Sequence, residues 1–125
     1  MKILSEMFAW WKGNTIGTRL FTWRKGERVG EDGLGNVYYR ERNGTRRWVV
    51  YETLAEPSQI APGWHAWLHF MVDELPTEED YTPRPWQKAH RPNMTGTYEA
   101  YRPAGSVLRP RVKEQPLDYE PWQPR

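Results

Sequence analysis

Two histidines four residues apart are the first residues whose spacing suggests chemistry. In a helix, His65 and His69 would lie on one face, the arrangement found in many zinc sites. A catalytic zinc centre also needs a third ligand and normally a glutamate beside the first histidine, where this chain has Ala66. The remaining histidine, His90, is distant in sequence. We therefore expect the two imidazoles to form a polar helix flank, and we predict no metal site.

A cluster of carboxylates follows the histidines, at Asp73, Glu74, Glu78, Glu79 and Asp80. Paired carboxylates can transfer protons, but this run has the composition of a solvated, charged segment. The three serines lack the context of a nucleophile, and the absence of cysteine excludes disulfides, thiolate metal sites and cysteine nucleophiles. We therefore expect neither catalysis nor a bound cofactor.

The distribution of tryptophan and proline divides the chain. Six of the eight tryptophans precede residue 70, whereas nine of the eleven prolines lie from Pro76 onward. The sequence predicts a folded head over residues 13–75 and a long extended Pro-rich tail over residues 76–125, because prolines interrupt both helices and sheets. Large side chains spaced through the tail would act as anchors for a partner; they are Tyr81, Trp86, Met94, Tyr98, Tyr101, Leu108, Tyr119 and Trp122.

The first twelve residues are expected to form an amphipathic helix. Its apolar face would hold Ile3, Leu4, Met7, Phe8 and Trp11. This face could pack on the head, on a partner, or at a membrane interface through residues 3–11. The segment is too short for a membrane span and lacks the features of a signal peptide, so the chain is expected to stay in the compartment where it is made.

The middle of the chain is expected to form an antiparallel meander of about three or four strands. Glycine-rich residues 32–36 predict a turn, and Asn43-Gly44 is a strong hairpin signal. The strands are expected over residues 18–24, 28–31, 36–42 and 45–51.

A helix is predicted over residues 62–72, with Pro62 in its first turn. Trp64, Trp67, Leu68 and Met71 would form a stripe that covers the meander. The predicted fold class is therefore α+β: a small antiparallel β meander with an N-terminal amphipathic helix and one Trp-rich helix, followed by the tail.

Charge and short motifs leave two other functions open. The net charge is only +2, with basic and acidic residues interleaved, which argues against nucleic acid as a partner. A nucleic-acid or ribosome-associated module would use the basic and aromatic side chains of Arg46, Arg47, Trp48 and Tyr51. A ligand for a proline-binding adaptor would use the single P-x-x-P at residues 121–124.

Three stretches of this sequence resemble a known family. They are VGEDGLGNVYY at residues 29–39, RWVVY at 47–51 and PGWHAWLH at 62–69. In this order and spacing they are similar to accessory subunit twelve of the alpha subcomplex of NADH:ubiquinone oxidoreductase, respiratory complex I. A related assembly-factor branch shares the Trp-rich head. Residues 86–97 match the W-x-K-x-H-x-x-N-x-T-G-T pattern of the permanent subunit. The resemblance covers roughly residues 13–103, and residues 112–125 match nothing in it.

The resemblance implies a non-catalytic subunit, not a homo-oligomer, that supports assembly and stability of the electron-transfer complex. Its expected partners are the core iron–sulfur and quinone-site subunits of the peripheral arm near the membrane. With no organellar presequence, a bacterial member at the cytoplasmic face of the plasma membrane is expected. The alternative role is that of the assembly factor. The candidate partner-binding residues are Trp86, Lys88, His90, Asn93, Thr95, Gly96, Thr97, Tyr101, Trp48, Trp64 and Trp67.

Overall fold

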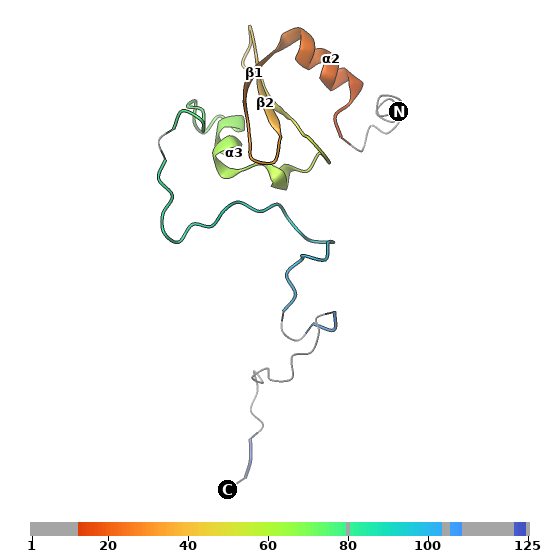
Figure 1. Ribbon diagram of the computed structural model, residues 1–125, viewed down its shortest axis with the longest axis vertical. Coiled ribbons are helices and arrows are strands. Elements are labelled where there is room, and N and C mark those ends of the chain that lie inside the picture. The colour runs from red at the N-terminus through yellow and green to blue at the C-terminus, as the bar shows by residue number, and fades with distance from the viewer. Residues whose placement is uncertain (1–12, 80, 104–105, 109–121, 125) are drawn as a thin grey trace. The chain divides into compact units, whose positions relative to one another are not determined.

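A computed structural model describes residues 13–79, 81–103, 106–108 and 122–124 of the chain. Residues 1–12, for which we predicted an amphipathic helix and a membrane-interface contact, lie outside the described residues, as does most of the stretch from 109 to the end. The chain divides into two compact units, Met1–Asn93 and Met94–Arg125. In the first unit, a three-stranded sheet stands between helices α2 and α3 (Figure 1).

Helix α2 spans Ile16–Lys25, where we had expected the first strand. That prediction was wrong, because local caps at both ends favour the helix over the strand propensity of its aromatic and β-branched residues. The Thr15 hydroxyl accepts a hydrogen bond from the Thr18 backbone N–H at 3.2 Å. At the other end, the Gly26 N–H donates to the Thr22 carbonyl, and Arg24 and Lys25 lie in the last turn, where cations favour the helix dipole.

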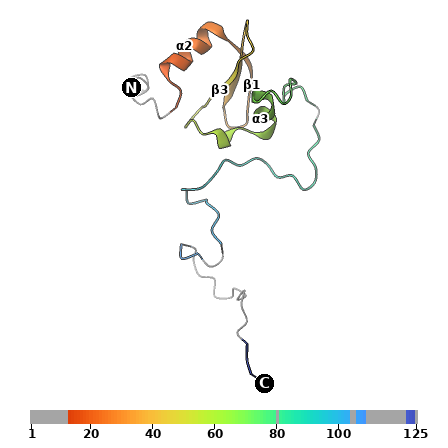
Figure 2. The same ribbon diagram turned by 180° about the vertical axis from the view of Figure 1, so that it is seen from behind.

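The sheet consists of β1 (Gly26–Glu31), β2 (Val37–Glu41) and β3 (Arg47–Val50), in that order, with antiparallel neighbours. The expected meander is confirmed, with three strands among the described residues. The β1–β2 register shifts between Arg28 and Gly30, whereas the β2–β3 register is regular. Figure 2 shows the sheet from behind, with β3 on the side of α2.

The turn between β1 and β2 is organised by Asp32. Its carboxylate accepts hydrogen bonds from the backbone N–H groups of Leu34 and Asn36, from the Asn36 side chain and from the Tyr38 hydroxyl. Burial alone would raise the pKa of Asp32, but these donors outweigh it and hold the pKa below its usual value. Burial and the neighbouring Asp32 raise the pKa of Tyr38. Tyr38 therefore stays a neutral donor in the core.

The core forms where α3 (Pro62–Leu68) packs on the sheet, after the short 3-10 helix η1 (Pro57–Gln59). Trp64 stacks on Tyr38 with ring centroids 4.0 Å apart and planes 4° apart, and Trp67 meets Trp64 edge-on. All three are buried, and Leu68 packs against them, as the predicted stripe requires. Met71 does not belong to this stripe, because the helix ends before it and its side chain is exposed.

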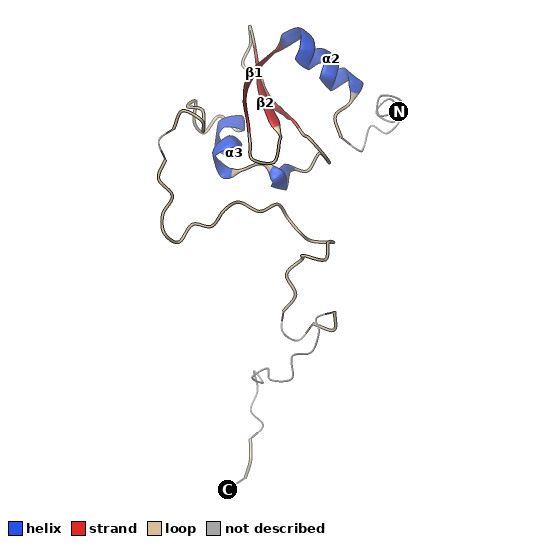
Figure 3. Cartoon of the chain, viewed as in Figure 1, coloured by secondary structure: helices blue, strands red, loops and turns tan. Residues whose placement is uncertain are grey.

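Beyond α3, the described residues form neither helix nor strand (Figure 3). Within the second unit, the Thr97 N–H donates to the Met94 carbonyl at 3.0 Å, and Gly96 has a φ of 85°, which favours glycine. The Ala100 N–H then donates to the Thr97 carbonyl at 3.2 Å. This part of the proline-rich tail thus contains consecutive hydrogen-bonded turns. In the described part of the chain, we find no helix long and apolar enough to cross a membrane.

Candidate partner-binding surfaces

Trp86 stands on a tight turn whose geometry is fixed by its own neighbours. The Gln87 backbone N–H donates to the Arg84 carbonyl at 2.9 Å, and Pro85 occupies the turn position that proline favours. The Gln87 side-chain oxygen accepts from the Tyr81 hydroxyl and from the Arg84 N–H, each at 2.6 Å. The turn leaves the Trp86 side chain 77% exposed. A large apolar ring exposed on such a turn is suited to enter a pocket on another protein.

His90 and Asn93 lie in the same segment and contact the head. The His90 Nε2 atom lies 2.8 Å from the Ser58 carbonyl oxygen, and the Asn93 backbone N–H donates to the Ser58 hydroxyl at 3.0 Å. The Ser58 hydroxyl in turn donates to the Glu56 carboxylate. We predicted both residues as partner contacts, but in this structure they join residues 84–93 to the loop that carries η1.

The other predicted contact residues divide between surface and core. Lys88, Thr95, Gly96, Thr97 and Tyr101 are exposed. Trp64 and Trp67 are 4% and 2% exposed, so their side chains pack the head and do not reach its surface. The spacing in the sequence placed them correctly on the apolar face of a helix, and that face is turned inward.

Trp48 is half-buried between α2 and the sheet. Its indole N–H donates to the Thr22 hydroxyl at 2.9 Å, and its ring lies against Phe21 of α2, with centroids 5.1 Å apart. Because the hydrogen bond fixes the indole, the ring forms a rigid wall beside the helix. That Trp48 contributes to a partner-binding surface remains a prediction.

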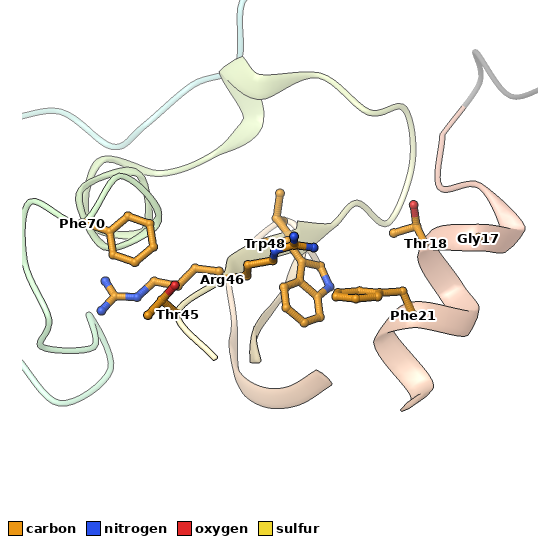
Figure 4. Close-up of a pocket in the computed structure, with 9 residues that line it drawn as sticks. Gly17, Thr18, Phe21, Thr45, Arg46, Trp48 and Phe70 are labelled. Atoms are coloured by element: carbon orange, nitrogen blue, oxygen red, sulfur yellow. The ribbon is translucent and has the colours of Figure 1, made fainter. Parts of the chain in front are cut away.

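A hollow of about 650 Å³ runs along β3 beside this wall, and the sequence did not predict it. Figure 4 shows Thr18 and Phe21 of α2 on one side, Phe70 on the other, and Thr45, Arg46 and Trp48 between them. We call this hollow the β3 groove; it is lined by Gly17, Thr18, Phe21, Thr45, Arg46, Arg47, Trp48, Val49 and Phe70. Its residues come from three segments far apart in sequence, so no local motif indicates it.

Phe70 reaches the β3 groove through an unusual backbone conformation. Its φ is 58°, the left-handed region that a residue just beyond a helix often adopts and that glycine normally fills. The Phe70 N–H donates to the Trp67 carbonyl and the Met71 N–H to the Ala66 carbonyl, which closes the end of α3. A phenylalanine in this conformation is strained, by about 1–3 kcal/mol for such residues in general.

Arg47 holds that strained end in place. Its guanidinium donates to the carbonyls of Trp67 and Val72 and pairs with Asp73 at 2.6 Å. It also lies 4.8 Å from the centre of the Trp67 ring and 4.4 Å from that of Phe70. With its side chain only 15% exposed, Arg47 connects β3 to the end of α3. The Arg47 guanidinium therefore stabilises the fold.

The described residues contain no group of side chains that could bind a metal ion. His65 and His69 lie beside each other, with ring centroids 4.2 Å apart, but no group of three histidine, cysteine or carboxylate residues comes together in the described part of the chain. The exposed Trp86 ring can enter an apolar pocket of another protein, and the β3 groove can hold apolar side chains of another protein.

Comparison with known proteins gives consistent matches. The family described as NADH ubiquinone oxidoreductase subunit NDUFA12 matches residues 26–124, which includes most of the end that the sequence motifs left unmatched. NADH dehydrogenase [ubiquinone] 1 alpha subcomplex subunit 12 of Bos taurus is 37% identical over 105 residues, 73% of this chain and 71% of the bovine protein. An uncharacterized protein of Rickettsia prowazekii is 31% identical, covering 78% and 86%. The alpha subcomplex subunit N7BM of Yarrowia lipolytica is 33% identical and covers 86% of each chain.

Proposed function

The chain belongs to the NADH ubiquinone oxidoreductase subunit NDUFA12 family, and from this membership we propose that it is a non-catalytic accessory subunit of respiratory complex I. The relatives in Bos taurus and Yarrowia lipolytica are named as NADH dehydrogenase subunits. The described residues contain no cluster of metal ligands, and neither candidate surface gathers groups that could do chemistry. Both surfaces are suited to binding protein. Contact with other subunits is therefore the role we assign.

Within that role, we propose that the chain clamps core subunits of the peripheral arm. The head would dock on one core subunit, and residues 77–125 would lie across that subunit and its neighbours. The observation that supports this most directly is the Trp86 turn, because hydrogen bonds hold its backbone and its large ring is exposed. A preformed turn loses little conformational entropy on binding. The expected location is peripheral, on the cytoplasmic face of a bacterial plasma membrane, next to the iron–sulfur and quinone-site subunits.

The test uses the full chain, tagged in its native host, and measures how much of it migrates with NADH dehydrogenase activity on a native gel after gentle solubilisation. We expect near-stoichiometric co-migration with the active complex. Trp86→Ala should lower the retained fraction strongly, because truncating a central anchor typically costs about 2 kcal/mol or more, roughly thirtyfold in affinity. Trp86→Phe, which keeps an aromatic ring, should retain much of the binding.

Three outcomes distinguish the alternatives. Full retention of Trp86→Ala would remove the anchor role of Trp86. If the chain migrates only with smaller, inactive assemblies, it is an assembly factor, as in the related branch. Absence from every assembly with NADH dehydrogenase subunits would overturn the proposed function as a whole.

A further inference from the structure

Within the part of the chain that the structure describes, no strand pairs with the outer edge of β3. The Glu41 N–H donates to the Arg46 carbonyl at 2.9 Å, and paired residues in an antiparallel ladder alternate between bonded and non-bonded. Given the pairs Tyr39 with Trp48 and Arg40 with Arg47, the backbone groups of Trp48 face β2. Those of Arg47 and Val49 point away from the sheet, and none of them has a hydrogen-bond partner within the described residues. They form a free row of donors and acceptors.

The β3 groove lies along this edge. Residues 45–49 all line it, although neighbouring side chains of a strand point to opposite faces of the sheet. A hollow lined by consecutive residues of a strand, here Arg47, Trp48 and Val49, runs beside the edge of that strand. The groove therefore gives access to the free backbone groups, and Phe21 and Phe70 stand on its two sides. An extended peptide is the ligand that uses such a row of backbone groups.

The two edges of the sheet are built differently. The outer strand β1 has an irregular register between Arg28 and Gly30 and carries Glu27 and Glu31, and bulges and charges of this kind discourage pairing with another strand. The regular strand β3 has the sequence Arg-Trp-Val-Val, without a bulge, proline or carboxylate. Of the two edges, β3 is the one suited to accept a further strand.

The charge around the groove indicates what kind of strand this would be. Residues 13–50 contain eight basic and four acidic side chains. The Arg46 guanidinium and the Lys25 amine both lie 6.0 Å from the centre of the Phe21 ring, at the margin of the groove. Arg24 and Arg42 line a neighbouring hollow of about 280 Å³, and neither they nor Arg46 form an ion pair within the described residues. The Lys25 amine is already 3.9 Å from the Glu41 carboxylate, so Arg24, Arg42 and Arg46 are the cations that complement carboxylates on a partner.

We propose that the open edge of β3 binds an extended, acidic segment of a partner protein as an added strand. Apolar side chains of that segment would lie against Phe21, Trp48 and Phe70, and its carboxylates would face Arg46. Nucleic acid fits less well, because the guanidinium of Arg47 is engaged by carbonyl groups and Asp73 and is turned away from solvent. That the partner is a complex I subunit rests on the proposed function; the added strand itself rests on the sheet.

Hydrogen exchange measured by mass spectrometry tests the added strand directly. The full chain is compared free and within the purified complex. The backbone amides of Arg47 and Val49 should exchange rapidly in the free chain and slowly in the complex, because their N–H groups acquire partners only there. Trp48 is an internal reference, because its N–H is already bonded to β2 in the free chain.

Two sets of variants separate this contact from the fold. Val49→Pro removes an N–H that faces the open edge and leaves the bonds to β2 intact. Because the Val49 side chain also packs against the core, Val49→Thr, which keeps the N–H, measures the effect of changing the side chain. Arg46→Glu reverses a charge beside the groove, and Arg28→Glu is the matched reversal on β1. Val49→Pro and Arg46→Glu should each weaken retention in the complex, Arg46→Glu by roughly fivefold and more at low salt. Val49→Thr and Arg28→Glu should not.

A photoreactive benzoylphenylalanine at Thr45 identifies the bound segment. The expected product joins residue 45 to a peptide of another subunit in which carboxylates flank apolar residues. Crosslinks to nucleic acid or to a second copy of this chain would overturn the proposal, as would unchanged exchange at Arg47 and Val49 in the complex. If Trp86 variants lose the complex while Arg46→Glu and Val49→Pro do not, the edge proposal fails and the proposed function stands. Absence of the chain from the complex would refute both.

Discussion

Replacing Gly30 by alanine should destabilise the head measurably, although alanine normally suits a strand better than glycine. Gly30 pairs with Tyr38 across the sheet, and the edge of the Trp64 ring covers it. An added Cβ would lie 2.5 Å from Trp64 Cη2 and 2.8 Å from Cζ2, far inside normal contact. The ring cannot simply retreat, because its face stacks on Tyr38 at 4.0 Å and both side chains are buried.

The size of the effect follows from two opposing terms. Overpacking of a core costs about 1–3 kcal/mol, and alanine in place of glycine in a strand recovers about 0.5–1 kcal/mol. We therefore expect the free energy of unfolding to fall by about 1–2 kcal/mol, which corresponds to a drop in Tm of roughly 5–15 °C for a domain of this size.

Thermal unfolding of the full chain, followed by circular dichroism, checks this prediction. Gly33→Ala is the matched control: a Cβ at Gly33 meets nothing within 4 Å, so its Tm should stay at or slightly above the wild-type value. If Gly30→Ala melts together with Gly33→Ala, the tight contact between β1 and the Trp64 ring does not exist in solution and the packing described here is wrong.

Two further predictions concern polar contacts of the head. Arg47→Lys keeps the charge but loses the planar guanidinium and its stacking on Trp67 and Phe70, so urea unfolding should show a free energy of unfolding lower by about 1–2 kcal/mol. Arg28→Lys, at an exposed ion pair, is the control and should match wild type. Equal urea midpoints for the two variants would contradict the role of Arg47. Because the pKa of Asp32 is lower in the folded chain than in the unfolded chain, its contribution to stability is complete above its unfolded pKa and is lost as the pH falls through the folded value, below about pH 4. Urea unfolding at a series of acidic pH values should therefore show a smaller loss for Asp32→Asn than for wild type, and parallel curves would refute this assignment.

The elements with strong local signals were predictable from the sequence. Asn43-Gly44 lies in the turn between β2 and β3, and Pro62 begins α3. Residues 18–24 were mistaken for a strand because aromatic and threonine side chains favour strands, while the evidence for a helix lay only in its ends, with Thr15 as the N-cap and Arg24 and Lys25 in the last turn. A cap contributes only about 1 kcal/mol, but a short segment with no fully buried residue is decided by terms of that size.

The candidate surfaces were predictable only in part. The motif in the tail directed attention to Trp86, which is indeed exposed, but it could not show that His90 and Asn93 reach back to Ser58, 32 and 35 residues away. The sequence also could not show that the side chains of Trp64 and Trp67 are buried in the core. The open edge of β3 depends on the order of strands in the sheet and on where α2 and Phe70 lie, which are long-range properties.

The contacts of Ser58 with His90 and Asn93 also bear on how fast the subunit could exchange between complexes. They attach the stretch next to Trp86 to the head. After the head or the Trp86 turn has bound the complex, the second of these two surfaces is therefore already close to its own binding site. For short connections the effective concentration is in the millimolar range, high enough for two weak contacts to act as one tight one. Release then requires both contacts to be open together, and either one can rebind first. Weakening one contact should shorten the residence time far more than it slows the first encounter.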